Sequence, residues 1–154
     1  MRIREIQTQD RAEWLRLLLE LYAGSDESDH IPIVDAFLNG SSSDWLLPSA
    51  VFVCEHESTG LCGFLELSVR NYAEGCIGAT PYVESWYVEA AARETGIGRK
   101  LIEAAEQWAL ANDYNELASD AELGNTLSQS AHKAVGFVEE ERVVHFRKQL
   151  QAAT

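Results

Sequence analysis

Hydrophobic residues recur along the chain with two different periods. Trp14, Leu18 and Leu21 lie three or four residues apart, and the same spacing returns in two later segments, which predicts amphipathic helices. Shorter apolar runs bounded by turn residues predict strands. The expected elements are a strand over 2–6, helices over 10–22 and 31–38, strands over 50–54, 62–69 and 81–88, a helix over 95–111, a strand over 117–120, a helix over 125–135, and strands over 137–141 and 143–148.

Turn and cap residues separate these elements. Asp10 with Glu13 resembles a capping box at the start of the first helix. Ser58-Thr59-Gly60 predicts the turn of a β-hairpin, while Asn39-Gly40 and Gly136 are expected to end helices. The sequence has no internal repeat and no linker, so we expect residues 1–154 to form a single domain.

A glycine loop joins the strand predicted over 81–88 to the helix that follows it. The loop has the pattern Arg93-x-x-Gly96-x-Gly98, and its glycines leave room for backbone to approach an anion. Unpaired N–H groups and the helix dipole both favour negative charge at such a helix start. Arg93, Arg99 and Lys100 concentrate cations there, which favours an anionic ligand over a strand-to-helix turn that uses glycine only for its geometry.

Charge and composition narrow the classes of function. The net charge is −13, and no Lys or Arg occurs between Leu17 and Val69, where nine acidic residues accumulate, Asp44 among them. This distribution excludes nucleic acid as a partner and favours either a cationic ligand or a solvated acidic surface. No apolar run is long enough to span a membrane, and the N-terminus does not resemble a secretory signal. Three cysteines without paired spacing and four scattered histidines predict buried thiols in a reducing compartment and no metal site.

Two spaced motifs in the expected order of elements resemble the GNAT superfamily of N-acetyltransferases. The first is the glycine loop, and the second is Asn125 followed by a helix that ends in His132-x-x-x-Gly136-Phe137. The resemblance implies an α+β fold, in which helices flank a mixed, mostly antiparallel central sheet in the order β-α-α-β-β-β-α-β-α-β-β. It also implies acetyl-CoA as co-substrate and no metal. The residues that would bind acetyl-CoA are Trp86, Tyr87, Val88, Arg93, Glu94, Thr95, Gly96, Ile97, Gly98, Arg99, Lys100 and Asn125.

Within this superfamily the chain looks most like an aminoglycoside 6′-N-acetyltransferase. The similarity covers most of residues 60–148, including Ala118-Ser119-Asp120 and Glu141-Arg142-Val143. It implies direct attack of the substrate amine on acetyl-CoA in a ternary complex, an aminoglycoside substrate, antibiotic resistance, a cytoplasmic location and a homodimer. The apolar residues Val143, Val144 and Phe146 give the homodimer weak support. The implied catalytic residues are Glu84, Asp120 and His132, and the implied substrate-binding residues are Tyr22, Tyr72, Glu84, Asp120 and Glu141.

Plainer interpretations remain open for each of these residues. Glu84 could face solvent on an alternating strand, and Asp120 could cap a helix. His132 stands where many superfamily members have tyrosine, and the alternative is a histidine that only packs on a helix face. Glu94 and Thr95 depart from the Arg- and Gly-rich residues often found in the loop. Tyr22 and Tyr72 could serve packing alone, and the role of Glu141 is the least certain because Glu139 and Glu140 adjoin it.

Two alternative functions also remain open. The chain could acetylate another cationic amine, such as a polyamine or a basic protein. It could also be a non-catalytic acyl-CoA sensor that keeps the fold without turnover.

Overall fold

A computed structural model describes residues 1–43, 46–58 and 60–153. Asp44 of the acidic segment and Thr59 of the expected hairpin turn therefore lie outside the described residues. The chain divides into two compact units, Met1–Asp120 and Ala121–Thr154, and each is described by itself. The expectation of one undivided domain stays a prediction.

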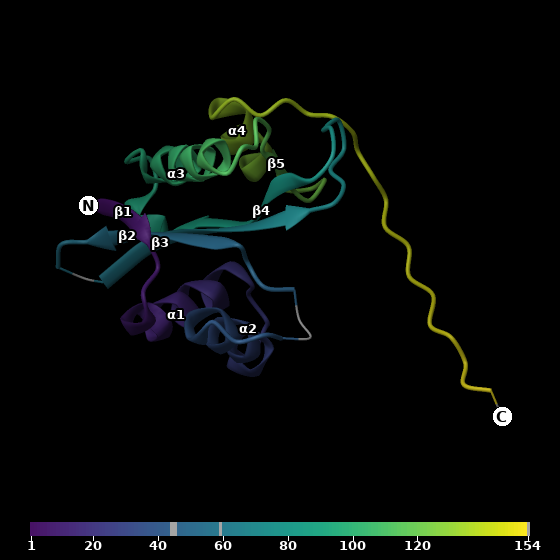
Figure 1. Ribbon diagram of the computed structural model, residues 1–154, viewed down its shortest axis with the longest axis horizontal. Helices are drawn as coiled ribbons and strands as arrows, with labels where there is room; N and C mark the ends of the chain where they lie inside the picture. The colour runs from purple at the N-terminus through teal and green to yellow at the C-terminus, as the bar shows by residue number, and fades with distance from the viewer. Residues whose placement is uncertain (44–45, 59, 154) are drawn as a thin grey trace. The chain divides into compact units, whose positions relative to one another are not determined.

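A mixed sheet forms the centre of the first unit (Figure 1). Its strand order follows the sequence, and neighbouring strands are antiparallel except β4 (Thr80–Val88) and β5 (Ala118–Ser119), which are parallel. The hairpin predicted around residue 60 is confirmed, because two strands pair antiparallel there. Ala50 lies opposite Leu67 at one end of the pairing, and His56 lies opposite Gly60 at the other. In the described part of this unit the strands are β1 (Arg2–Glu5), β2 (Ala50–His56), β3 (Gly60–Arg70), β4 (Thr80–Val88) and β5 (Ala118–Ser119).

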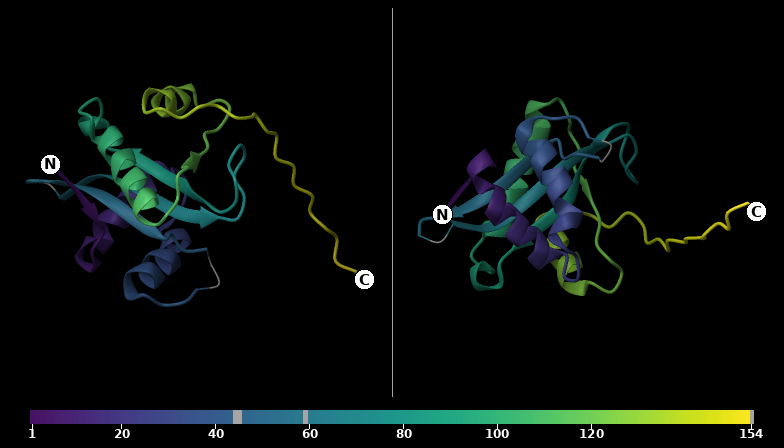
Figure 2. Two further views of the ribbon diagram at one scale, coloured as in Figure 1. Left: turned by 45° about the horizontal axis from the view of Figure 1, so that its top comes forward. Right: turned by 90° about the horizontal axis from the view of Figure 1, so that it is seen from below.

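Helices cover both faces of this sheet (Figures 1 and 2). A 3-10 turn, η1 (Thr8–Asp10), leads into α1 (Arg11–Leu21) and then α2 (Glu27–Asn39), which lie together on one face. A second 3-10 turn, η2 (Ala90–Ala92), precedes α3 (Ile97–Ala111) on the other face. Because hydrophobic side chains from both layers are removed from water, their burial drives the packing. The core beneath α1 and α2 includes Trp14, Leu17, Val34, Val51, Val53 and Phe64, each at most 1% exposed.

Two details of the helical layer differ from expectation. Asp10 does not form a capping box with Glu13, because Arg4 holds both Asp10 carboxylate oxygens at 2.7 and 2.9 Å. Asp10 instead bonds the backbone N–H of Gln7 at 2.8 Å, at the start of η1. Helix α2 begins four residues earlier than predicted. Its N-terminus has a capping box formed by Asp26 and Asp29, a polar signal that hydrophobic periodicity does not reveal.

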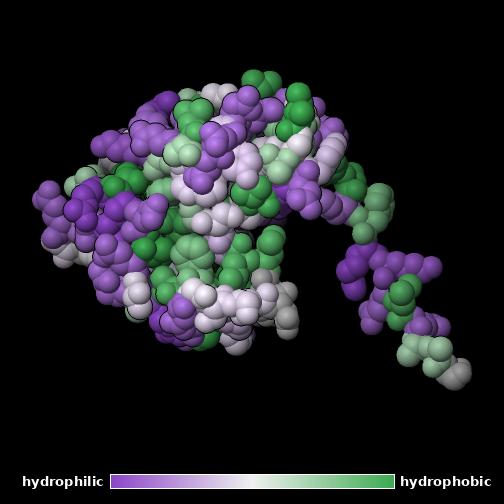
Figure 3. Space-filling view, viewed as in Figure 1, coloured by the Kyte–Doolittle hydropathy of each residue, from purple (hydrophilic) through white to green (hydrophobic). Residues whose placement is uncertain are grey.

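The second unit contains one helix in its described residues, α4 (Thr126–Ala134). Gly136 follows it with a φ of +100°, as expected of a glycine that ends a helix. The strands predicted over 137–141 and 143–148 are wrong, since residues 137–153 form neither helix nor strand. Hydrophobic and hydrophilic residues are mixed along this segment (Figure 3), but a strand also needs a neighbour for its backbone groups, and no described strand pairs with it.

No helix in the described ranges is long and apolar enough to cross a membrane.

Candidate active site

A β-bulge determines where Glu84 points. Glu66 of β3 pairs with Ser85 of β4, but the next residue, Leu67, pairs with Val83, so Glu84 is an extra residue in β4. Glu66, Ser68 and Arg70 share one face of β3, because side chains alternate along a strand. Since Glu84 bonds Ser68 and Arg70, the bulge brings its carboxylate onto that face, which lies toward α1 and α2. The alternative in which Glu84 faces solvent by simple alternation is therefore wrong.

The carboxylate of Glu84 is held by a cation. Arg70 donates from Nε to Oε1 at 2.8 Å and from Nη2 to Oε2 at 2.7 Å, and Ser68 Oγ also donates to Oε1. Burial is the largest influence on the pKa of Glu84 and raises it. The hydrogen bonds from Arg70 and Ser68 together outweigh that effect, so the pKa lies below its usual value and the group is ionised at neutral pH.

Asp120 joins the same network through Tyr82. The Tyr82 hydroxyl donates to Asp120 Oδ2 at 2.7 Å, and the Arg70 guanidinium lies over the Tyr82 ring, 3.6 Å from its centre. Burial, followed by the bond to Asp120, raises the pKa of Tyr82, so its hydroxyl keeps its proton and remains a donor. The structure thus gathers Glu84 and Asp120, which are 36 residues apart in sequence, around one guanidinium and one phenol.

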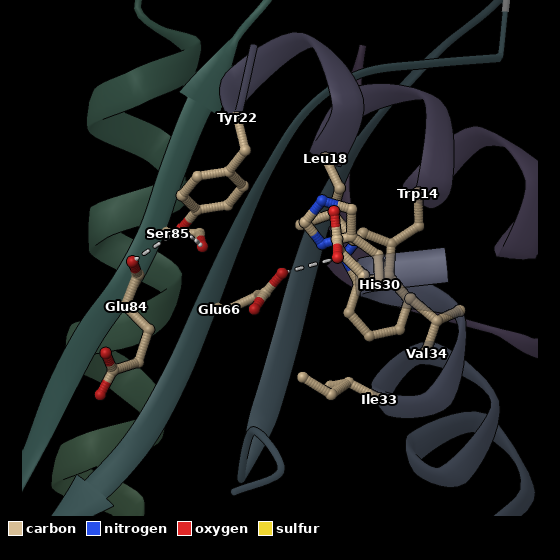
Figure 4. A pocket seen from close by; sticks show the side chains of 10 residues that line it. Trp14, Leu18, Tyr22, His30, Ile33, Val34, Glu66, Glu84 and Ser85 are labelled. Atoms are coloured by element: carbon tan, nitrogen blue, oxygen red, sulfur yellow. Dashed lines mark hydrogen bonds between the residues drawn. The ribbon is translucent and has the colours of Figure 1, made fainter. Parts of the chain in front are cut away.

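A cleft of about 310 Å³ lies between this face of the sheet and the helices α1 and α2 (Figure 4). Tyr22 is part of its wall, where the hydroxyl contacts Ser85 Oγ at 2.7 Å and the ring stacks on His30. Tyr72 is not among the lining residues. It is 70% exposed and bonds Glu74 Oε2 at 2.5 Å. The full lining consists of Trp14, Leu18, Tyr22, Asp29, His30, Ile33, Val34, Glu66, Glu84 and Ser85.

Several of these residues escaped the sequence analysis. The sequence does contain a signal for Glu66, because this is the single charged residue in the apolar run from Leu61 to Val69. An acid in the middle of a doubly buried strand is an unusual placement. His30 and Asp29 had no comparable signal, since they lie in a polar segment that was read as a break between helices.

The glycine loop begins α3 without a side-chain cap. Gly96 is the N-cap residue, with a φ of +85°, and a Cβ at this position would meet no atom within 4 Å. Glu94 also has a positive φ, of 63°. The N-terminus of α3 therefore lacks a capping side chain and has open space beside Gly96, which suits an anionic ligand. Arg99 and Lys100 follow in the first turn and are exposed.

Gly98 differs from Gly96. Its φ is not in the left-handed region, and a Cβ would come within 3.3 Å of the Trp86 indole, whose Nε1 donates to Gly98 O at 3.1 Å. Glycine here allows close packing of α3 on β4, because a Cβ would require the Trp86 ring to shift. Arg93 bonds Val88 O at 2.9 Å, so this cation also ties the loop to the end of β4.

The last part of β4 is paired on one side. In the described residues β4 pairs with β5 at Tyr82 and Val83 alone, while β3 pairs with β4 as far as Val88. The described pairing between β4 and β5 therefore stops before the end of β4.

Three predicted site residues belong to the second unit. Asn125 is the N-cap of α4, and its Oδ1 accepts from Ser128 N at 3.1 Å. His132 Nδ1 lies 2.7 Å from Ser128 O, and its ring packs edge-on against Phe137. Glu141 is exposed in the segment without secondary structure. Their roles toward substrate and acetyl-CoA stay predictions.

Comparison with known proteins places this arrangement in a family. Residues 9–137 match the family model described as Acetyltransferase (GNAT) family. The chain is 40% identical to the aminoglycoside N(6′)-acetyltransferase type 1 of Klebsiella aerogenes, covering 96% of each chain, and 33% identical to that of Stenotrophomonas maltophilia, covering 97% of this chain and 94% of the relative. The solved structure of AAC(6′)-Iy in complex with the bisubstrate analogue CoA-S-monomethyl-acetylneamine aligns with a TM-score of 0.84 at 29% identity, covering 97% of this chain and 98% of that one. The chain therefore belongs to the GNAT family of acetyltransferases.

Proposed function

We propose that this protein transfers the acetyl group of acetyl-CoA to the 6′-amino group of aminoglycosides, and so confers resistance to them. The observation that carries the proposal is the arrangement of β4. One part of this strand places Glu84 beside an acid-lined cleft, and its end leads through Val88 into the glycine loop. An amine site and an anion site thus adjoin the same strand. Similarity to relatives named aminoglycoside N(6′)-acetyltransferases supports the choice of substrate.

Acetyl transfer to an amine requires an uncharged nitrogen, stabilisation of the carbonyl oxygen and departure of the thiolate. Glu84 and Asp120 are suited to hold the ammonium form and to accept its proton directly or through water. A backbone N–H near Val88 is suited to the carbonyl oxygen, since the described pairing of β4 with β5 is limited to Tyr82 and Val83. Acetyl-CoA supplies the activated thioester, so the protein needs no nucleophile of its own. Holding both reactants side by side lowers the barrier by roughly 7–11 kcal/mol.

The remaining assignments extend this scheme. Arg93, Gly96, Gly98 and the N-terminus of α3 would bind the pyrophosphate, and Asn125 would contact acetyl-CoA. His132 would protonate the leaving thiolate. Tyr22, Tyr72 and Glu141 would complete the substrate site, with Tyr22 supported by its place in the wall of the cleft.

The proposal includes a homodimer in the cytoplasm. Val144 and Phe146 are 72% and 94% exposed in the C-terminal segment, where apolar side chains favour a partner. The reducing cytoplasm suits the free, buried thiols of Cys54 and Cys62. Light scattering at high micromolar concentration should give the mass of a dimer, and the double variant Val144→Asp, Phe146→Ser should give a monomer. A monomeric wild type would contradict the proposed assembly.

Steady-state acetylation assays test the function. We expect kanamycin to be a better substrate, by kcat/KM, than spermidine or a lysine-rich peptide. Equal or faster turnover of spermidine would instead assign the enzyme to polyamines. Tight binding of acetyl-CoA in a calorimeter without acetylation of any amine in the panel would identify an acyl-CoA sensor and refute an enzyme.

A further inference from the structure

Among the described residues the fold buries two carboxylates, and only one of them forms an ion pair there. Asp10 is 7% exposed and Glu66 is 9% exposed. Asp10 is held by both terminal nitrogens of Arg4, as described above. Glu66 has no salt bridge among the described residues, and its one hydrogen bond there comes from Trp14 Nε1 to Oε1 at 3.1 Å. The second oxygen, Oε2, has no protein partner in this part of the chain.

The side chain of Glu66 points into the cleft and not into the packed core (Figure 4). It lies on β3 between the side of the cleft formed by Glu84 and Ser85 and the side formed by Trp14. Arg70 is two strand residues from Ser68 and shares the face of Glu66, but both of its bonds go to Glu84. The fold therefore leaves an acceptor oxygen of a buried acid directed at a space that a ligand can enter.

A buried carboxylate without a cation is costly, because its charge loses hydration without gaining a counter-ion. Burial, the largest cause, and the neighbouring charge of Glu84 raise the pKa of Glu66 to about 7, although the Trp14 bond acts in the opposite direction. A cation supplied by a ligand would reverse this effect. The walls nearby are apolar, being formed by Leu18, Ile33 and Val34, so an ion pair in the cleft would be poorly screened.

We propose that Glu66 binds a second ammonium group of the aminoglycoside inside this cleft, separate from the amine held by Glu84. The inference rests on the proposed function, because it deepens the substrate site of that reaction. The volume of about 310 Å³ lies at the lower end of the roughly 300–1,000 Å³ typical of small-molecule pockets, so the cleft fits one amino-bearing ring and not a whole antibiotic. Glu66 is then a residue that selects substrates with at least two ammonium groups.

This role has a pH signature. An ammonium group favours the ionised carboxylate, so binding must expel the proton that Glu66 carries below its own pKa. Affinity should therefore rise as pH increases through about 7. The other titratable groups that face the cleft are Tyr22 on α1, Asp29 and His30 on α2, and Glu84 on β4. A Glu66→Gln variant keeps all of them, so its difference from the wild type isolates Glu66.

Calorimetric titration with kanamycin tests the proposal. Wild type, Glu66→Gln and the matched control Glu106→Gln, which removes an exposed carboxylate of α3, are titrated at pH 6 and pH 8 in two buffers of different ionisation enthalpy. We expect Glu66→Gln to bind at least tenfold more weakly than the wild type at pH 8 and within about threefold at pH 6. It should also release fewer protons near pH 7. Glu106→Gln should match the wild type throughout.

A second variant covers the case in which Glu66→Gln does not fold, as judged by its thermal melt. Ile33→Trp narrows the cleft from α2 without altering its charge and should weaken kanamycin binding at both pH values. Unchanged affinity and proton release in a folded Glu66→Gln, or unchanged affinity in Ile33→Trp if Glu66→Gln is unfolded, would overturn the inference. A wild type that binds kanamycin through Glu66 but does not acetylate it would refute the proposed function alone. A wild type that does not bind kanamycin would overturn both.

Discussion

Arg70 donates two hydrogen bonds to the carboxylate of Glu84. The acid that we expect to bind the substrate amine is therefore already paired with a cationic side chain of the protein. The pair is half-buried, with the Arg70 side chain 39% exposed and that of Glu84 26% exposed. A substrate ammonium must therefore share Glu84 with Arg70 or displace it. This arrangement keeps Glu84 ionised and oriented before substrate arrives, which lowers the cost of ordering the site on binding.

Removal of the Glu84 charge should impair use of the aminoglycoside and not binding of acetyl-CoA. A close ion pair in a partly shielded cleft is worth on the order of 1–4 kcal/mol, so we expect Glu84→Gln to lower kcat/KM for kanamycin roughly tenfold to several hundredfold. Asp120→Asn should act in the same direction. Steady-state kinetics and a separate titration with acetyl-CoA distinguish the two substrates. Wild-type kcat/KM in both variants would show that the amine binds elsewhere.

Removal of Arg70 should strengthen substrate binding if Arg70 and the substrate ammonium compete for the Glu84 carboxylate. In Arg70→Met the ammonium no longer shares Glu84 with a guanidinium, so we expect KM for kanamycin to fall several-fold at pH 8. The Arg70 hydrogen bonds and charge that lower the pKa of Glu84 are also lost, while its burial and the Ser68 hydrogen bond remain, so that pKa rises. Activity that needs ionised Glu84 should then disappear at a higher pH than in the wild type as the solution is acidified.

The pH dependence of kcat/KM measures this shift. Arg11→Met is a matched control, because Arg11 also pairs with a carboxylate, that of Asp35, but on an exposed helix surface. It should leave the acid limb unchanged. An acid limb in Arg70→Met that coincides with that of the wild type would mean that Glu84 ionisation does not govern turnover.

Gly96 should be required for acetyl-CoA and not for folding. Gly96→Val introduces a branched side chain at a φ of +85° and into the open space before α3. Backbone strain should cost about 1–2 kcal/mol of stability, and binding of acetyl-CoA should be lost. Gly40→Val is the control, since Gly40 has a φ of +64° and equally open surroundings at the end of α2. It should show similar strain with normal binding, whereas equal affinities in both variants would refute the anion-binding loop. Gly98→Val is less informative because its side chain would press on Trp86.

Local patterns predicted most of the elements in the first unit. The apolar face of α1 and the strand run from Leu61 to Val69 both follow from hydrophobic periodicity, which the core of the sheet confirms. The orientation of Glu84 could not be obtained in this way, because a bulge depends on how β3 and β4 pair. The same reason explains the failure for residues 137–148, where β-branched and aromatic residues occur without a pairing partner in the described structure.

Contacts between particular side chains could not be predicted from the sequence either. The role assigned to Asp10 changed because Arg4, six residues earlier, competes with a helix cap for its carboxylate. Glu66 was visible as an acid in an apolar run, but its missing counter-ion is a property of the folded cleft. Sequence therefore proposed Glu84 and Asp120 for the amine site, and the structure shows the Arg70 guanidinium and the Ser68 and Tyr82 hydroxyls that bind these carboxylates.

The buried acid should also make stability depend on pH in an unusual direction. The pKa of Glu66 is about 7 in the folded protein and has an ordinary value of 4.5, so between these values the folded state binds more protons than the unfolded state. Raising the pH through this window therefore destabilises the wild type, by up to about 3 kcal/mol once the window is passed.

Glu66→Gln lacks this titration and keeps a carbonyl oxygen for the Trp14 hydrogen bond. We expect its free energy of unfolding to exceed that of the wild type at pH 8, with the difference shrinking toward pH 5 because the wild-type group is then neutral in the folded state. Urea denaturation at several pH values measures both. The control Glu106→Gln should show no such trend. A Glu66→Gln variant that is less stable than the wild type at pH 8 would mean that the carboxylate has a stabilising partner in the folded protein. The absence of a counter-ion would then no longer support binding of a substrate cation at Glu66.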